Sequence, residues 1–211
     1  MIKGLIKNVF PHFDEELVDV LEKVSVVRNY TKGQALASRG KTLNGLTIIT
    51  SGNVKVYQEG EDGNEFVIGY VKIGSSFGGS ICDDDRTEKK SMLNFKAIEN
   101  TGTLLISFAD KDILAKKYNN WYKYLLQNTV NFQKFYLDKF ENIAFKNLDG
   151  RVLFFLEQFS KIYENSTLRI SHREIAESLN SSREVVSRIL KKMEQEGKIN
   201  MSHNEIEILS F

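Results

Sequence analysis

The sequence predicts an α+β fold, in which a β-rich N-terminal part and a helical C-terminal part are joined by one long helix. Residues 25–108 contain short runs of β-branched and aromatic residues separated by glycine turns, a pattern typical of a sandwich or barrel. Residues 120–144 carry apolar side chains at helical spacing, and residues 170–193 contain two helix starts with a turn between them.

The chain has 211 residues, of which 41% are hydrophobic and 27% charged, and its net charge is +1. This is the composition of a globular protein with room for two modest domains. No run approaches the roughly 18 apolar residues that cross a bilayer, and the start, MIKGLIKNVFPHF, does not read as a secretory signal. We therefore expect a cytoplasmic protein that does not contact membranes.

Residues that commonly act in catalysis or metal binding are few in this sequence. A single cysteine, Cys82, excludes an internal disulfide and a four-cysteine cluster. The three histidines, His12, His172 and His203, are isolated from one another, and no nucleophile–base pair or phosphate-binding glycine loop is present. The sequence therefore predicts no metal site, no cofactor and no enzymatic activity.

Residues 1–24 are expected to be helical, because apolar residues repeat there at helical spacing: Phe13, Leu17, Val20, Leu21 and Val24. From Ser25 onward the pattern changes to that of strands. The six expected strands are VSVVRNY, LTIIT, NVKVYQE, EFVIGYVK, LNFKAIE and TLLISF. Turns are expected at Gly33, Gly40, Gly52, Gly63 and from Gly74 to Gly79.

A short helix is expected from Asp110 to about Tyr118, and a long one from near Asn120 to about Ala144. The long helix has two apolar stripes. The first consists of Trp121, Leu125, Asn128, Phe132 and Phe135. The second consists of Tyr122, Leu126, Val130, Leu137 and Phe140. A helix that is apolar on two sides must bury both, so one side can cover the β-rich part and the other is left for a partner helix. The alternative is a fully enclosed core helix.

Two serine–glutamate pairs three residues apart, Ser171 with Glu174 and Ser181 with Glu184, can each form a capping box at a helix start. Asn180 lies between the two helices, in the turn. The buried stripe of the second helix is expected to be Val186, Ile189, Leu190 and Met193. Helix, tight turn and helix with an arginine-rich outer face is the arrangement that enters the major groove of DNA.

Two further elements flank this motif. A helix is expected before it, from Phe145 to Lys161. After it, Gly197 is expected to cap the second helix, and two strands should follow, Ile199–Met201 and Glu205–Leu209, around a turn at residues 203–204. Two strands after a helix-turn-helix form a wing, so the C-terminal part is predicted to be a winged helix-turn-helix.

Three exposed side chains of the second helix, Arg183, Glu184 and Arg188, are expected to read base edges. Arginine fits the acceptors of guanine, and a carboxylate accepts from cytosine. Phosphate contacts are expected from residues at the helix starts or beside the reading face: Ser171, His172, Arg173, Ser182, Ser187 and Lys191. The alternative is that this face is only the solvated side of an ordinary amphipathic helix.

The segment SSREVVSRILKKMEQEGKI resembles the recognition helix of the Crp/Fnr family of bacterial transcription regulators, in which an SRE-x-x-x-R pattern supplies the base-reading side chains. KNLDGRVLFFL is similar to the segment that opens the DNA-binding domain of that family. TKGQALASRGKTLNGLTIITSGNVKVY resembles the first half of its cyclic-nucleotide-binding β-roll, a jelly-roll barrel. The resemblance implies a sensor domain with N-terminal helices (1–118), a dimerisation helix (119–144) and a winged helix-turn-helix DNA-binding domain (145–211).

The resemblance also implies partners. It implies a homodimer that pairs through the long helix, with the first stripe (Trp121, Leu125, Asn128, Phe132 and Phe135) as the expected interface. It implies double-stranded DNA with an inverted-repeat operator, and RNA polymerase as a further partner.

The sensor part departs from the cyclic-nucleotide binders of the family. These carry Phe-Gly-Glu and, some ten residues later, Arg-Ser or Arg-Thr, where the acid holds the ribose and the arginine neutralises the phosphate. Here the candidate pocket residues are Phe77, Gly78, Gly79, Ser80, Lys90 and Ser91, without the glutamate or the arginine. Lys89, Lys90 or a displaced Arg86 could still neutralise a phosphate. We expect an effector that is not cyclic AMP or cyclic GMP and whose identity the sequence does not give.

Two functions from different classes are compatible with these features. The first is a homodimeric transcription regulator that binds specific DNA and senses a small molecule. The second is a regulatory module that does not bind DNA, in which the β-rich part binds a small ligand or a protein and the C-terminal helices serve only in packing. The outer face of residues 182–193 discriminates between them, because the second function gives no reason for two arginines beside a glutamate.

Overall fold

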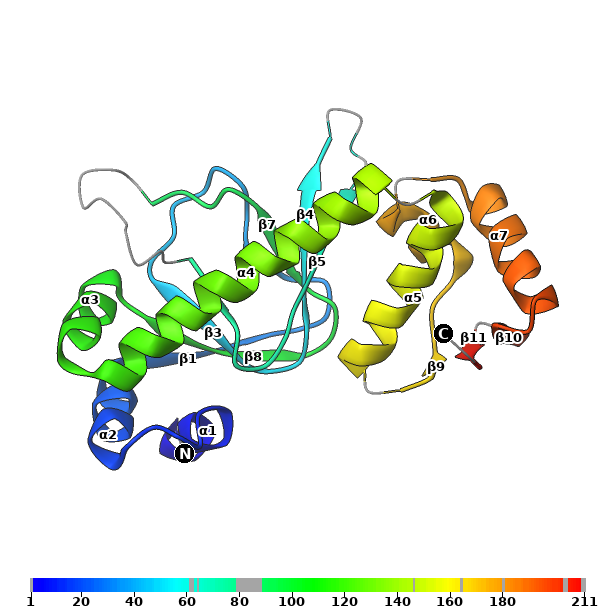
Figure 1. Cartoon of the computed structure of the whole chain (residues 1–211). Coiled ribbons are helices and arrows are strands. Elements are labelled where there is room, and N and C mark those ends of the chain that lie inside the picture. The colour runs from blue at the N-terminus through cyan, green and yellow to red at the C-terminus, as the bar shows by residue number, and fades with distance from the viewer. Residues whose placement is uncertain are drawn as a thin grey trace. The chain divides into compact units, whose positions relative to one another are not determined.

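The computed structural model describes residues 2–60, 63, 65–78, 89–145, 147–163, 165–179, 181–202 and 205–209. The chain forms two compact units (Figure 1). The first comprises Met1–Val56 and Gly69–Phe135, and the second comprises Tyr57–Ile68 and Tyr136–Phe211. Among the described residues, no helix has both the length and the apolar character needed to span a membrane.

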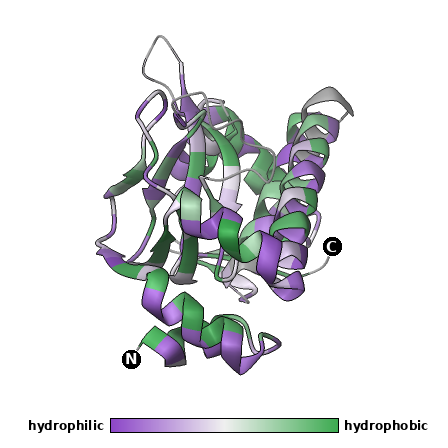
Figure 2. Cartoon of the chain, turned by 90° about the vertical axis from the view of Figure 1, so that its left-hand side faces the viewer, coloured by the Kyte–Doolittle hydropathy of each residue, from purple (hydrophilic) through white to green (hydrophobic). Residues whose placement is uncertain are grey.

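The N-terminal segment is helical, as expected, and forms two helices, α1 (Ile2–Val9) and α2 (Glu15–Val24). The only proline of the chain lies between them, at position 11, and proline cannot continue a helix. Asp14 then starts α2, because its carboxylate accepts the Leu17 N–H at 2.9 Å. Figure 2 shows that both helices carry hydrophobic as well as hydrophilic residues.

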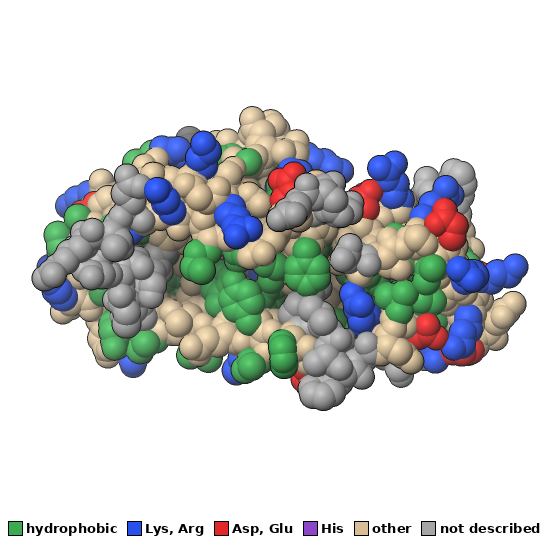
Figure 3. Space-filling view, turned by 90° about the horizontal axis from the view of Figure 1, so that it is seen from above, with side chains coloured by type: hydrophobic (Ala, Val, Ile, Leu, Met, Phe, Trp, Pro, Cys, Tyr) green, Lys and Arg blue, Asp and Glu red, His purple; other side chains and the backbone are tan. Residues whose placement is uncertain are grey.

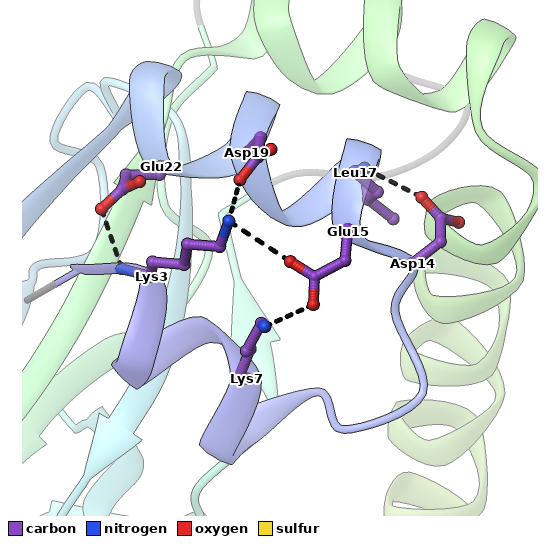
Figure 4. Close-up of polar contacts among 7 residues, drawn as sticks. All are labelled: Lys3, Lys7, Asp14, Glu15, Leu17, Asp19 and Glu22. Carbon is purple, nitrogen blue, oxygen red and sulfur yellow. Dashed lines mark hydrogen bonds and ion pairs between the residues drawn. The ribbon is translucent and has the colours of Figure 1, made fainter.

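Ion pairs and buried apolar residues together join α1 to α2. Lys3 contacts the carboxylates of Asp19 and Glu15, and Lys7 also contacts Glu15 (Figure 4). The backbone N–H of Lys3 donates to Glu22 at 3.1 Å. These side chains are largely exposed, so the ion pairs are weak. The pKa values of Glu15 and Asp19 lie below their usual range, mainly because the lysines donate hydrogen bonds to them.

The β-rich part contains eight strands among the described residues: β1 (Ser25–Tyr30), β2 (Ala35–Ala37), β3 (Leu46–Ser51), β4 (Val54–Glu59), β5 (Glu65–Val71), β6 (Ser76–Phe77), β7 (Asn94–Ala97) and β8 (Thr101–Ile106). They form two four-stranded sheets, with the orders β1-β8-β3-β6 and β2-β7-β4-β5. The α+β fold class is confirmed, and the expected turn glycines at 33, 40, 52, 63, 74 and 78 all have positive φ. β2 and β6 were not predicted, because two or three residues are too few to show alternation.

One face of the sheet β1-β8-β3-β6 is covered by helices. The β8 strand pairs with β3 so that Leu104 lies opposite Ile48 and Ile106 opposite Leu46. These four side chains are buried together with apolar residues from α1, α2, α3 (Phe108–Lys117) and the first turns of α4 (Asn119–Phe145). This cluster is the core of the first unit.

The first apolar stripe of α4 packs against its own chain, and this corrects the predicted interface. Trp121 and Leu125 are fully buried, and the indole N–H of Trp121 donates to the Lys111 carbonyl at 3.1 Å. The Asn128 amide exchanges two hydrogen bonds with the backbone of Ser76, at 2.9 and 3.0 Å. The remaining members, Phe132 and Phe135, are half-buried, and a side-chain carbon added to Gly69 would lie 1.8 Å from the Phe135 ring. The stripe predicted for dimerisation therefore presents little surface to a partner.

The second stripe of α4 is exposed instead. Its members, between 40% and 67% exposed, are Tyr122, Leu126, Val130, Leu137 and Phe140. The sequence could not rank the two stripes, because both repeat with the same helical period. Other hydrophobic side chains are exposed as well, and Figure 3 shows several of them gathered on one face beside Lys and Arg side chains.

The C-terminal segment has the predicted winged helix-turn-helix elements. They are α5 (Leu148–Tyr163), β9 (Thr167–Leu168), α6 (His172–Ser178), α7 (Arg183–Gln195), β10 (Ile199–Ser202) and β11 (Glu205–Ile208). The three strands form one sheet in the order β10-β11-β9. β9 was not predicted, because it has only two residues. Gly197 follows the last turn of α7 with a φ of 70°, as expected of a residue that ends a helix.

Replacing Ile6 with alanine should lower the free energy of unfolding by about 2–5 kcal/mol, because its fully buried side chain would leave a cavity in the core. Lys3→Ala serves as the control on the same helix and should have a clearly smaller effect, since its ion pairs are exposed. Urea unfolding of the full chain measures both. Equal losses would mean that the ion pairs of Lys3 contribute as much as the burial of Ile6 to holding α1 in place.

Candidate nucleic-acid interface

The first helix of the motif, α6, begins with the predicted capping box. The Ser171 hydroxyl accepts the Glu174 N–H at 3.2 Å, and the Glu174 carboxylate accepts the Ser171 N–H at 2.8 Å. The same carboxylate also accepts the Ser171 hydroxyl at 2.7 Å. Both donors of Ser171 are thus used inside the cap, and a phosphate would have to compete with Glu174 for them.

The second helix, α7, begins one residue later than predicted. Its N-cap is Ser182, whose hydroxyl accepts the Val185 N–H at 3.3 Å, so the proposed capping box of Ser181 with Glu184 is wrong. Ser181 instead donates its N–H to the Ala176 carbonyl at 2.9 Å and closes the turn after α6. Adjacent serines made the start ambiguous by one residue. The predicted turn residue Asn180 lies outside the described residues.

The two faces of α7 are those that the sequence predicted. The buried stripe consists of Val186, Ile189, Leu190 and Met193. The side chains of Arg183, Glu184, Arg188 and Lys191 are exposed. Within the described part of the chain, the three cations among them have no carboxylate partner. Their charges and donors are therefore available to an external anion or acceptor.

Glu184 is the acidic member of this face. Its pKa lies below the usual range, first because its own backbone N–H donates to the carboxylate, then because the Ser182 hydroxyl does so and because Arg183 and Arg188 are near. The carboxylate is therefore ionised at neutral pH, and an ionised carboxylate only accepts hydrogen bonds. A donor such as an exocyclic amino group is the kind of partner that it can bind.

His172 and Ser187, two of the predicted phosphate contacts, are bonded to each other. The Nδ1 atom of His172 lies 2.9 Å from the Ser187 hydroxyl oxygen and so joins the start of α6 to the middle of α7. The pKa of His172 is lowered, chiefly by burial and then by the charge of Arg183. Its imidazole is therefore neutral at pH 7, and its main structural effect is to hold the two helices in register.

Arg173 lies on the exposed side of α6. Its guanidinium Nε contacts the Glu177 carboxylate at 2.8 Å, one helical turn away, and both side chains are exposed. Exposed pairs of this kind contribute little to stability. The arginine can exchange Glu177 for another anion at small cost.

Two side chains of α5 make polar contacts with the helix-turn-helix motif. The sequence did not predict these contacts. The Arg151 guanidinium donates to the carbonyl of Leu179, the C-cap residue of α6, at 2.7 Å. Asp149 accepts from Lys192 of α7 at 2.7 Å. The only signal in the sequence was the Asp-Gly-Arg triplet at 149–151, and its contacts lie 28 and 43 residues away along the chain.

The candidate effector residues near β6 are tightly packed. Phe77 is buried and stacks on Phe95, with ring centroids 3.9 Å apart. Gly78 has a φ of 91°, and a side-chain carbon there would lie 2.7 Å from the Gly45 carbonyl oxygen. Only glycine fits at position 78, so its occurrence is explained by packing and does not itself indicate a ligand.

Of the other candidate effector residues, the structure describes Lys90 and Ser91. Lys90 is exposed, whereas Ser91 is buried and its hydroxyl donates to the Leu93 carbonyl at 2.6 Å. Gly79 and Ser80 lie outside the described residues. Among the described residues, no group of three or more His, Cys, Asp or Glu side chains could hold a metal ion.

Two families match this chain in separate segments. Residues 27–111 match the family described as the cyclic nucleotide-binding domain. Residues 150–211 match the family described as the Crp-like helix-turn-helix domain. The second match contains α6, α7 and the three-stranded sheet.

Similar proteins are also found over most of the chain. The chain is 25% identical over 181 residues to the cAMP-activated global transcriptional regulator Vfr of Pseudomonas aeruginosa, covering 82% of this chain and 85% of that one. A crp/fnr-family regulator of Eubacterium rectale superposes with a TM-score of 0.75 at 22% identity, over 96% and 95% of the two chains. The c-di-GMP responsive regulator CLP of Xanthomonas campestris has a TM-score of 0.76 at 22% identity, over 94% of this chain and 100% of that one. The two structures share the fold of this chain.

Replacing Arg151 with methionine should lower the free energy of unfolding of the C-terminal segment by about 1.5–3 kcal/mol, because the Leu179 carbonyl would lose a charged donor. Lys192→Met, which removes the exposed pair with Asp149, should have a smaller effect. Hydrogen exchange at the amides of residues 172–179 measures the local opening. Unchanged exchange in the Arg151 variant would mean that α5 does not hold α6 through this bond.

Proposed function

This chain belongs to the Crp/Fnr family of DNA-binding transcription regulators, and on that premise we propose that Arg183, Glu184 and Arg188 read base edges in the major groove. The single observation that carries the proposal is the division of α7 into two faces. One face is buried in the motif, and the other presents two arginines and an ionised carboxylate without partners of opposite charge from other described elements.

The chemistry of the three side chains supports base reading. An arginine guanidinium can donate two parallel hydrogen bonds to O6 and N7 of guanine, and a carboxylate can accept from N4 of cytosine. A patch that bound only phosphates would gain nothing from an acid between the arginines, because the acid would repel the DNA backbone. Glu184 therefore favours sequence-specific binding over general DNA affinity.

We propose that phosphates are bound around this reading face. Lys191 has an exposed ammonium without a described carboxylate partner, and Arg173 can exchange Glu177 for a phosphate. The backbone N–H groups at the starts of α6 and α7 are suited to anions as well. The other proposed contacts, which must first give up bonds inside the motif or its caps, are Ser171, His172, Ser182 and Ser187.

We propose a homodimer that pairs through the exposed stripe of α4. Its members Tyr122, Leu126 and Val130 lie on one side of the helix, and each is at least 40% exposed. An apolar stripe along a helix favours pairing with another helix. A dimer with a two-fold axis would bind an inverted repeat whose half-sites lie about one helical turn apart, roughly 34 Å.

The rest of the proposal concerns organisation and partners. Residues 1–118 would form the sensor domain, 119–144 the dimerisation helix and 145–211 the DNA-binding domain. We propose that the protein acts in the cytoplasm, with RNA polymerase as a further partner, as is typical of the family.

We propose that the effector is not a cyclic nucleotide. Vfr is described as cAMP-activated and CLP as c-di-GMP responsive. This chain has Gly79 where the cyclic-nucleotide binders of the family have glutamate, and Lys90 at the arginine position. The Ser91 hydroxyl, next to Lys90, is already bonded inside the chain. A ligand whose polar groups lose water without finding partners binds weakly.

Selection of genomic fragments by the purified full chain, followed by footprinting, tests the proposed function. We expect one enriched motif with two-fold symmetry. Binding without sequence preference would refute the reading face. No DNA binding in any condition would favour the alternative, a regulatory module whose β-rich part binds a ligand or a protein.

Alanine at Arg183 or Arg188 should weaken binding to the selected operator by about 1–3 kcal/mol and relax the preference at one base pair per half-site. Arg173→Ala is the matched control. It should weaken binding equally on all sequences. The slope of log affinity against log salt concentration should become less steep by about one. Competition binding on a set of single-base variants separates the two patterns. Uniform loss at Arg183 and Arg188 would make them phosphate contacts.

Leu126→Glu should convert the dimer to monomers, because it places a charge in the proposed apolar interface, and should weaken operator binding. Asn131→Glu introduces the same charge on the same helix outside the stripe, and should leave the dimer intact. Sedimentation analysis of both variants measures the oligomeric state. A folded Leu126→Glu variant that stays dimeric would remove this stripe from the interface.

Cyclic AMP and cyclic GMP should show no binding at micromolar concentrations in calorimetry, because the two strongest polar anchors of the family are missing from the sequence. Operator affinity should be the same with and without either nucleotide. Micromolar binding of one of them, coupled to tighter operator binding, would show that other residues have rebuilt the phosphate site.

A further inference from the structure

The sheet β1-β8-β3-β6 has a second face, opposite the one that packs on the helices. Successive side chains of a strand point to opposite faces, so the neighbours of the buried Leu46, Leu104 and Ile106 belong to this second face. It carries Arg28 and Tyr30 from β1, Thr47 from β3, Phe77 from β6 and Leu105 from β8. Thr47 lies directly between Leu105 and Phe77 in the register of the sheet.

A cavity of about 230 Å³ lies against this face. Its floor is formed by the five residues just named, and its other wall is formed by β2 and by residues 38 and 41–45. Only Phe77 is shared with the candidate effector residues near β6 that the sequence predicted. The cavity is therefore a different place on the sensor part of the chain, and it lies wholly within the first unit.

The charge of the cavity is positive. Arg28 and Lys41 both line it, and none of its described lining residues is acidic. Neither cation has an ion-pair partner among the residues that the structure describes. This contrasts with Lys3 and Lys117 of the same unit, which contact carboxylates. Two cations that share a cavity without a counter-charge favour the binding of an anion.

The other residues that line the cavity indicate what the rest of such a ligand should look like. Apolar surface is contributed by Leu36, Leu43, Phe77 and Leu105, and hydroxyls by Tyr30, Ser38, Thr42 and Thr47. Pockets for drug-sized ligands have about 300–1,000 Å³, so a cavity of about 230 Å³ suits a smaller molecule. A single anionic group on a short apolar body matches both the charge and the walls.

The wall that carries Lys41 is held in place by backbone hydrogen bonds. The Gly40 N–H donates to the Ser91 carbonyl at 2.8 Å, and the Ser91 N–H donates to the Lys41 carbonyl at 2.9 Å. The Leu43 N–H donates to the Lys89 carbonyl at 2.7 Å. The backbone that carries Lys41 is therefore held by the neighbouring segment, and a preformed wall lowers the cost of binding.

We propose that this cavity binds a small organic anion, a carboxylate or a phosphate monoester with a short apolar body. Arg28 and Lys41 bind the anionic group, and the side chains of Leu36, Leu43 and Leu105 contact the apolar body. The binding itself does not depend on the proposed DNA function. A role of this anion as effector does rest on that function.

Three probes that share a phenyl group test whether binding requires a negative charge. They are phenylacetate, phenyl phosphate and the uncharged phenylacetamide. Calorimetry with the full chain should detect binding of at least one of the two anions and no binding of the amide. Arg28→Gln and Lys41→Gln should each weaken anion binding by at least about tenfold, as expected for the loss of a charged hydrogen bond. Arg39→Gln is the matched control, because Arg39 lies in the same segment but does not line the cavity.

The outcomes separate the possibilities. Binding of phenyl phosphate alone or of phenylacetate alone supports the proposal and assigns the anionic group. Binding of the amide with equal affinity, unchanged binding in Arg28→Gln and Lys41→Gln, or no binding of either anion overturns it. Thermal unfolding checks that the variants fold. Operator binding is measured separately, without probes. Failure of the wild type to bind DNA would refute the proposed function, and the result on anion binding could still be interpreted.

Discussion

Trp121 lies fully buried where α3 meets α4, and its indole N–H donates to the Lys111 carbonyl. Seven residues further along, Asn128 exchanges two hydrogen bonds with the backbone of β6. Together these contacts allow only one rotation of α4 about its axis. Because each residue advances the helix by about 100°, the side that carries Leu126 must then face away from the core. The surface proposed for pairing is thus a consequence of how the core is packed.

A similar dependence on a few polar contacts governs the reading face. Val186 and its neighbours bury one side of α7, but burial alone does not fix the angle between α6 and α7. The contact of His172 with Ser187 and the contact of Arg151 with the C-cap carbonyl of α6 supply that constraint. The proposed base reading needs such a constraint, since a small change in the helix angle would move the side chains of Arg183 and Arg188 away from the bases that we propose they contact.

The sequence predicted best those elements whose signals are local. Capping serines, glycine turns and apolar periodicity indicated α6, α7, most strands and the wing, because each signal lies within a few residues of the element that it specifies. Contacts between segments that are distant along the chain could not be predicted from the sequence. The two stripes of α4 have the same period, so only the packing against Ser76 and Lys111 distinguishes them. The contact of Arg151 with Leu179 and the cavity with Arg28 and Lys41 depend in the same way on tertiary structure.

The burial of Trp121 has an optical consequence. It is the only tryptophan of the chain. The centroid of its ring system lies 5.4 Å from that of Tyr124 and 6.3 Å from that of Phe13. The tryptophan fluorescence of the protein therefore originates from one apolar place, in the first turn of α4. Any loosening of this helix from its own core would admit water to the indole and shift its emission to longer wavelengths. The native chain thus carries its own spectroscopic label at the start of α4, and no dye needs to be attached.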